Sequence, residues 1–237
     1  MFYDYLRRGA LAGLVGGVSF GAYTAFVVQP LITTVESGGH DHAGAAIEGV
    51  ELTATTTTLA SVAASVALGL LFGILVFGVI YFLLEPTVPG RDGVKSYVLG
   101  GAGFLSVSGA PWLILPPLPP GVERAVPADL SLLLYVAMVF VGAATAGVAV
   151  FAWKRIDGPA QFPVIVAAFV PLVALSIVAS PVPTTGSTPP TLAAAFRAVV
   201  VTGQLVLWGL IAGTHAMLTE RAATPVDHAD FDPSRSG

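Results

Sequence analysis

The sequence predicts an all-α membrane protein, a bundle of about six transmembrane helices with both termini in the cytoplasm. Of its 237 residues, 55% are hydrophobic and only 10% are charged, whereas soluble domains hold about 25% charged residues. The apolar residues also fall in long blocks separated by short polar joints, which is typical of membrane spans rather than of a soluble core. We therefore expect a multi-pass protein of the cell membrane, in direct contact with the lipid bilayer.

Six apolar blocks are each long enough for a helix to cross the hydrocarbon layer, which takes about 20 residues. Together they form one transmembrane domain over residues 1–218, and they leave no room for a separate soluble domain. Pro171 is expected to kink the fifth span. The expected spans are residues 9–28, 59–84, 97–115, 130–153, 162–179 and 192–218, followed by a disordered polar tail at residues 219–237.

The basic residues between the blocks indicate the orientation, because cytoplasmic joints are enriched in Lys and Arg. With six spans, eight basic residues fall on one side and Arg124 alone falls on the other. This alternation supports the count of six and places both termini in the cytoplasm. The eight residues are Arg7, Arg8, Arg91, Lys95, Lys154, Arg155, Arg221 and Arg235.

Four glycines recur at a strict four-residue interval in the first block: Gly9, Gly13, Gly17 and Gly21. This spacing lines one helix face with small residues, which lets another helix approach closely. The face is therefore predicted to pack against a helix of the same chain or of a partner. A cleaved signal peptide is the alternative, since Arg7 and Arg8 precede the block; its length and its glycine face argue against cleavage.

Several function classes are excluded or unsupported by composition and motifs. The chain has no cysteine and a net charge of −4, so thiolate chemistry is excluded and nucleic acid is not an expected partner. No phosphate-binding loop, zinc-protease motif or nucleophile elbow is present. We therefore predict that the protein is not an enzyme and holds no permanent cofactor.

The predicted outer loop between the first two spans has the pattern of a metal-capture site. His40 and His42 flank Asp41, and glycines lie on both sides. In an extended segment alternate side chains point the same way, so the two imidazoles can close on one ion, with Glu36 as a further ligand. Imidazole with carboxylate suits divalent ions such as Co²⁺, Ni²⁺ or Zn²⁺. The alternative is a solvated loop whose histidines bind nothing.

A second candidate is a polar stripe on the sixth span, formed by Arg197, Gln204, Trp208 and His215. Their spacings from Arg197 are 7, 11 and 18 residues, which place all four within roughly 20° of one helix direction. Such a row points inward and could line a translocation pathway. The alternative, slightly favoured by the residues alone, is that the two end residues snorkel to the surfaces and Gln204 bonds another helix.

The sequence resembles the predicted cobalt transporter family CbtA over nearly its whole length, excluding the tail. Leu118 and Ser176 stand where the family usually has an acidic residue and a histidine, and residues 132–138 lack its polar and tryptophan residues. The likeness is carried in order by residues 26–32 with Glu36, residues 48–53, residues 100–104, the proline-rich residues 110–121, residues 128–130 and residues 195–197.

The resemblance implies a membrane permease subunit for a divalent transition-metal cation, cobalt above all, as the transported ion. It also implies a partner, a small single-span subunit with a histidine-rich end that resembles CbtB. A homo-oligomer is compatible with the sequence as well. The alternative function is a structural or assembly membrane protein without transport activity, which the glycine series motivates.

Overall fold

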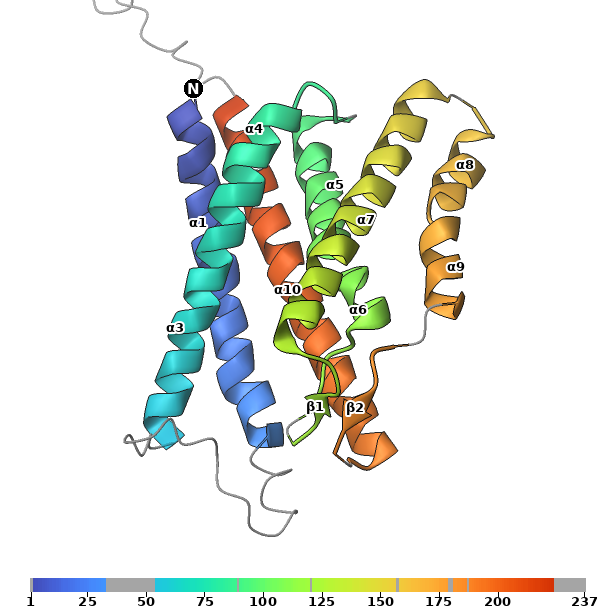
Figure 1. Ribbon diagram of the computed structural model, residues 1–237. Helices are drawn as coiled ribbons and strands as arrows, with labels where there is room; N and C mark the ends of the chain where they lie inside the picture. Colours follow the sequence, from blue (N-terminus) through green and yellow to red (C-terminus); the bar gives the residue numbers. More distant parts are fainter. Residues whose placement is uncertain are drawn as a thin grey trace, which may run out of the picture.

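The computed structural model describes residues 2–32, 54–88, 90–119, 121–156, 158–178, 181–186 and 188–223. Within them it is almost entirely helical (Figure 1), which confirms the predicted all-α membrane protein. Five helices are long and apolar enough to cross a bilayer, and a shorter apolar helical segment occupies the place of the fifth predicted span. The five are Phe2–Ile32, Thr56–Leu84, Gly93–Ile114, Ala128–Arg155 and Pro190–Ala222, and the shorter segment is Gln161–Leu175.

Several of these helices change their winding along their length, and three contain π-helical stretches. The first span is α1 (Phe2–Tyr23) with η1 (Thr24–Val28), the second is α3 (Ala54–Phe72) with η2 (Gly73–Ile80) and α4 (Tyr81–Leu84), and the third is α5 (Asp92–Phe104) with η3 (Leu105–Gly109) and α6 (Pro111–Ile114). The remaining helices are α7 (Ala128–Arg155), α8 (Gln161–Ala168), α9 (Val170–Val178) and α10 (Pro190–Ala223).

Successive membrane-crossing segments run in opposite directions, with α8 and α9 together forming one of them, so the joints alternate between the two ends of the bundle. The start of α1, the joint between α4 and α5, the joint between α7 and α8 and the end of α10 all lie at one end (Figure 1). Those four places carry the described basic residues of the predicted cytoplasmic side, whereas Arg124 lies in β1 at the opposite end. We call these the basic end and the outer end. That the basic end faces the cytoplasm stays a prediction.

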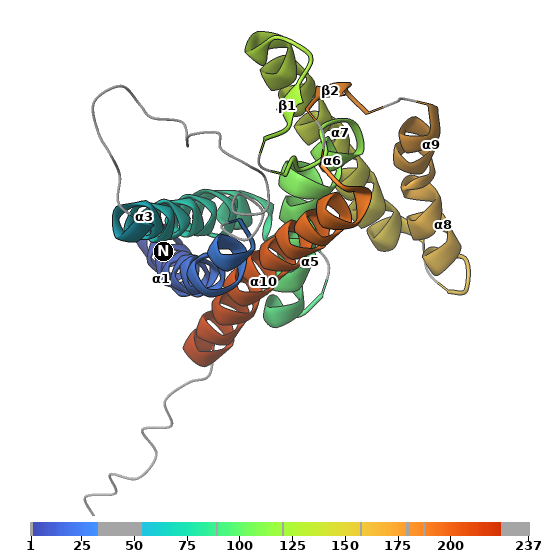
Figure 2. The ribbon, with the colours of Figure 1, turned by 90° about the horizontal axis from the view of Figure 1, so that it is seen from below.

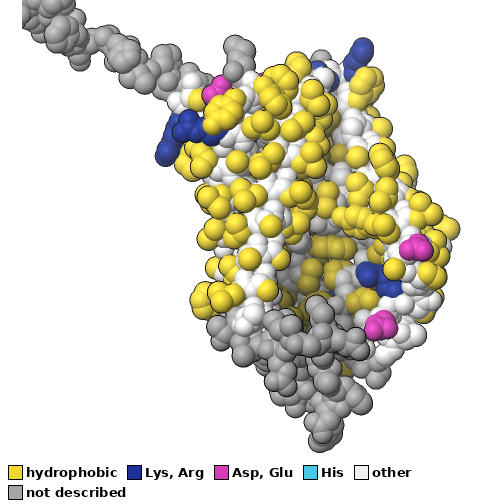
Figure 3. All heavy atoms as spheres, turned by 60° about the vertical axis from the view of Figure 1, so that its left-hand side comes forward, with side chains coloured by type: hydrophobic (Ala, Val, Ile, Leu, Met, Phe, Trp, Pro, Cys, Tyr) yellow, Lys and Arg dark blue, Asp and Glu magenta, His cyan; other side chains and the backbone are white. Residues whose placement is uncertain are grey.

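The outer surface suits a bilayer. Large hydrophobic side chains such as Phe26, Phe140 and Ile177 are exposed on the helices. In Figure 3 hydrophobic side chains cover the visible face, and the charged ones gather toward its two ends. Exposed apolar side chains in such number would be costly in water but are at no disadvantage among lipid tails.

The core of the bundle lies among α1, α3 with η2, α5 and α10, which Figure 2 shows grouped together. Its buried side chains include Phe72, Phe77, Leu207, Trp208 and Ile211. The ring of Phe72 stacks on that of Trp208 with centroids 4.9 Å apart. Because lipid tails are as apolar as these side chains, close packing and hydrogen bonds rather than expulsion of water hold the helices together.

The glycine series of α1 lies against a second set of glycines on the second span. A Cβ added at Gly13 would overlap the carbonyl oxygen of Gly69, and one added at Gly9 would overlap that of Gly73. At Gly17 the added atom would lie 2.9 Å from the carbonyl oxygen of Ser65. Backbone therefore meets backbone along most of the interface between α1 and α3, an approach that only glycine permits.

The helices α7, α8 and α9 form a second layer beside this core. Met138 of α7 packs with Ala110 and with Leu172 of α9 in a separate small cluster, and α8 and α9 lie at the far side of α7 in both views (Figures 1 and 2). The break between α8 and α9 falls at Phe169, two residues before Pro171. Proline has no N–H to donate and disfavours helical geometry in the residue before it, which explains why the segment is interrupted there.

A short antiparallel ribbon at the outer end was not predicted from the sequence. β1 (Glu123–Arg124) pairs with β2 (Thr184–Thr185), and the N–H of Val182 donates to the carbonyl of Ile114 at 2.9 Å. Strands of two residues carry no detectable periodicity, and these two lie about 60 residues apart in the sequence. The ribbon joins the loop before α7 to the loop before α10.

Candidate functional site

The predicted metal-capture loop lies outside the described residues. Glu36, His40, Asp41 and His42 all fall between residues 32 and 54, so their role as metal ligands stays a prediction. In the part of the chain that the structure describes, no group of three or more His, Asp or Glu side chains is close enough to hold a metal ion.

The polar stripe of the last span lies on α10 and turns mostly inward. His215 is fully buried, Trp208 is 2% exposed, Gln204 is half-buried and Arg197 is exposed. The three inner residues face the third span, α5 with η3, as their contacts below show. The row thus marks the interface between α5 and α10 and reaches the surface only at Arg197, near the outer end.

His215 is held in a polar and aromatic pocket close to the basic end. Its Nδ1 lies 2.9 Å from the hydroxyl of Ser96 in a hydrogen bond, and its ring lies edge-on to Tyr81, with centroids 4.6 Å apart. The ring of Phe77 is 5.3 Å away. Among the described residues its Nε2 makes no hydrogen bond of good geometry, although the ring interacts with the backbone of Phe77. A fully buried imidazole is costly within a membrane, so His215 is a candidate functional group.

Gln204 makes the second polar contact across the same interface. The hydroxyl of Ser108 donates to Oε1 of Gln204 at 3.3 Å. Ser96 and Ser108 are 12 residues apart, whereas Gln204 and His215 are 11 apart, close to three regular turns. The third span accommodates its extra residue in η3, where the N–H of Ala110 donates a hydrogen bond to the carbonyl of Leu105, five residues earlier. A π-helical turn holds one residue more than an α-helical turn, so both serines face α10.

Trp208 fills the space between these two polar contacts. A Cβ at Gly103 of α5 would overlap the indole ring, and the ring stacks on Phe72 from the other side. The indole Nε1 is buried without a hydrogen-bond partner in the described residues. We call the row of Gln204, Trp208 and His215, with Ser96 and Ser108 opposite, the polar seam; in this structure Trp208 closes its middle.

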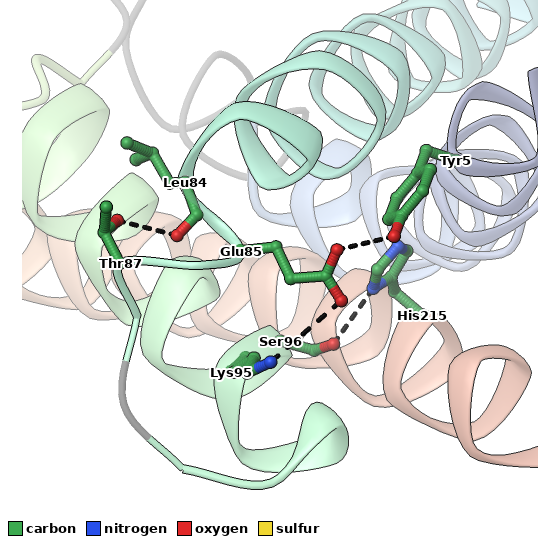
Figure 4. A network of polar contacts seen from close by, with 7 residues as sticks. All are labelled: Tyr5, Leu84, Glu85, Thr87, Lys95, Ser96 and His215. Atoms are coloured by element: carbon green, nitrogen blue, oxygen red, sulfur yellow. Dashed lines mark hydrogen bonds and ion pairs between the residues drawn. The ribbon is translucent and has the colours of Figure 1, made fainter. Parts of the chain in front are cut away.

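A carboxylate lies next to the seam at the basic end. The Tyr5 hydroxyl donates to Oε2 of Glu85 at 2.5 Å, and Nζ of Lys95 lies 4.0 Å from Oε1 of the same carboxylate. Figure 4 shows this group beside the pair of Ser96 and His215. The first three spans and α10 therefore meet in one polar cluster beneath the basic end.

Sequence reasoning did not single out Glu85, Ser96 or Ser108. The position of Glu85 at the end of a long apolar run was the available signal, because a carboxylate there needs a partner. The two serines gave no such signal in the sequence. At 100° per residue they lie about 120° apart on a regular helix, and only the π-helical turn brings them to the same face.

Replacing Tyr5 by phenylalanine is expected to lower the free energy of unfolding by about 1 kcal/mol, because the carboxylate of Glu85 loses a hydrogen-bond donor. For a chain of this size the melting temperature should fall by about 2–4 °C. Tyr3→Phe is the matched control, since Tyr3 lies on the same helix and is 74% exposed. Equal melting temperatures for both variants in detergent would contradict a stabilising role for the Tyr5–Glu85 bond.

Comparison with known proteins gives one family. A family model described as "Probable cobalt transporter subunit (CbtA)" matches residues 2–220, which include every described helix up to the last turn of α10. No curated protein and no solved structure matches the chain significantly. Since the match spans nearly the whole sequence, this chain, a multi-pass membrane protein, belongs to the CbtA family of probable cobalt transporter subunits.

Proposed function

We propose that the chain is the permease subunit that carries a divalent transition metal, cobalt above all, across the membrane. The observation that carries the proposal is the polar seam, because buried imidazole and amide groups inside a bilayer are expensive and usually mark a substrate path. Family membership supports cobalt as the ion. The seam crosses much of the bundle, since Gln204 and His215 lie about 16 Å apart along α10 at 1.5 Å per residue.

The capture step is assigned to the outer loop. His40 and His42, helped by Asp41 and Glu36, collect the ion on the side opposite the basic end. The imidazoles must be neutral to bind metal, so capture weakens as the pH falls through their ordinary pKa of about 6.5. Two histidines with one or two carboxylates bind with modest affinity, which suits an ion that is passed on rather than stored.

The passage step is assigned to the seam. Gln204 and His215 line the path between α5 and α10, and Arg197 stands at its outer end, where its fixed positive charge raises the electrostatic barrier for cations and so gates their entry. The indole of Trp208 blocks the path until α5 and α10 separate. Glu85, at the basic end of the seam, offers a carboxylate to an ion that leaves.

The driving force is assigned to the ion gradient, the membrane potential or a second subunit, because the sequence has no ATP-binding motif. A small single-span subunit with a histidine-rich end is the proposed partner, in keeping with the family description as a transporter subunit. A transporter of this kind performs no covalent chemistry, so we propose no enzymatic activity.

The test is calorimetric titration of the purified protein with Co²⁺ at about pH 7.5 and again at about pH 5. Binding should be clear at the higher pH, weaken in acid as the imidazoles take up protons, and be lost when His40 and His42 are both replaced by alanine. His228→Ala is the matched control, since it removes a histidine from the C-terminal tail. Equal binding by the double variant and the wild type would remove the loop from the mechanism.

The alternative, an assembly protein that moves nothing, was motivated by the glycine face of α1. That face is occupied within the chain by Gly69 and Gly73 of the second span, so it is not a free surface for a partner. The alternative therefore loses the observation that favoured it. Normal cobalt accumulation in cells that lack the gene would revive it.

A further inference from the structure

An apolar groove opens on the lipid-facing side of the bundle, between the second, third and fourth spans. It encloses about 690 Å³, and Figure 1 shows α5 at the back between α4 and α7. Its walls include Leu75, Leu99 and Val139. None of the residues of the polar seam lines this groove, so the proposed passage step does not account for it.

The charges at the rim of the groove are all of one sign. Lys154 and Arg155 line its basic end, and none of the described lining residues is acidic. In the described part of the chain neither of the two makes an ion pair. The guanidinium of Arg155 lies over the ring of Phe151, 5.2 Å from the centroid, and Phe151 is itself a wall residue. The positive charge is thus held at the mouth of the groove.

The length of the groove and the charge at its mouth suit a lipid. From Val139 to Arg155 the groove follows α7 for about 24 Å, which exceeds the depth of one leaflet, about 15 Å. An acyl chain can therefore lie along the apolar walls, and an anionic headgroup at the basic end would meet Lys154 and Arg155.

We propose that this groove binds an anionic phospholipid, with one acyl chain along η2, α5 and α7 and the phosphate against Lys154 and Arg155. A basic pocket between membrane helices at the cytoplasmic side is the arrangement that recognises anionic headgroups. The bound lipid would fill the space between the core helices and α7. It would also neutralise two positive charges that have no acidic neighbour among the described residues that line the groove.

The test compares binding of phosphatidylglycerol and phosphatidylcholine, with identical acyl chains, to delipidated protein in detergent by native mass spectrometry. Phosphatidylglycerol should bind more tightly. The double variant Lys154→Gln, Arg155→Gln should lose about fivefold in affinity for each charge removed, or about 30-fold in total. Arg7→Gln combined with Arg221→Gln is the matched control, because both arginines are exposed at the same end and neither lines the groove.

A second variant tests the position of the acyl chain. Gly147 lines the groove, and a Cβ added there would meet nothing within 4 Å, so a larger side chain can enter the groove from this position. Gly147→Phe should abolish retention of both lipids, and an unchanged melting temperature would show that the fold tolerates the ring. Equal affinity for the two lipids would overturn the proposal. Three other results would also overturn it. Phosphatidylglycerol could still bind to the Gly147→Phe variant, or soluble glycerol phosphate could bind as tightly as the lipid. A polypeptide could also cross-link to position 147 in native membranes.

Discussion

Gly13→Leu is expected to prevent the bundle from forming. Gly13 lies against Gly69, and a Cβ at either position would overlap main-chain atoms of the opposite helix. Overpacking of a well-packed core, where side chains and backbone can still shift, costs about 1–3 kcal/mol. Here no side chain can move aside, so the cost should exceed the upper end of that range. Little monodisperse protein should be recovered by size-exclusion chromatography in detergent, and what remains should melt at a clearly lower temperature.

The same substitution on an open helix face provides the control. Gly209 lies on α10 and has nothing within 4 Å of the position of its missing Cβ. Gly209→Leu should therefore fold normally, and it should gain slightly in helix propensity. If Gly13→Leu were as stable as Gly209→Leu, α1 and α3 would not be in contact through their glycines.

His215→Phe is expected to abolish cobalt transport while the fold survives. The change keeps a ring of similar volume between Phe77 and Tyr81, and swaps that conserve volume usually cost less than about 1.5 kcal/mol. The hydrogen bond to Ser96 is lost, but such bonds between membrane helices contribute only about 0.6 kcal/mol on average. If His215 lines the path, initial uptake of labelled cobalt by cells should fall about tenfold or more, because the polar group is removed from a buried site.

Ser96→Ala separates the histidine from its partner. It removes the hydrogen bond but leaves the imidazole, so uptake should fall far less than in His215→Phe. Normal uptake by a well-folded His215→Phe protein would show that His215 has only a packing role. In that case the path would have to avoid this part of the seam.

The all-α membrane fold was predictable from the sequence because long apolar blocks reflect the thickness of the membrane. The break at Phe169 follows from Pro171 for a similarly local reason. The ribbon of β1 and β2 was not predictable, since two residues on each side cannot show a period. Its pairing depends on helices that bring residues 123 and 185 together.

The candidate site was predictable in part. The spacing of Gln204, Trp208 and His215 identified one face of α10, and the structure places that face against α5. The partners Ser96 and Ser108 could not be identified from the sequence. A regular α-helical period does not place them on one helix face, because η3 contains one residue more than a regular turn. The role of His40 and His42 stays a prediction, since those residues lie outside the described part of the chain.

The contacts of α10 carry a consequence for biosynthesis. This helix is made after all the other described helices, yet it packs against α1, and the hydroxyl of Tyr23 at the end of α1 donates to the carbonyl of Val199 at 2.9 Å. Proteins fold as they emerge, beginning with their N-terminal parts. We therefore expect α1 and α3 to pair early through their glycines and then to wait with one side uncovered. Only after α10 has emerged from the ribosome can it dock and complete the core, so a message truncated before α10 should yield a chain that the cell degrades.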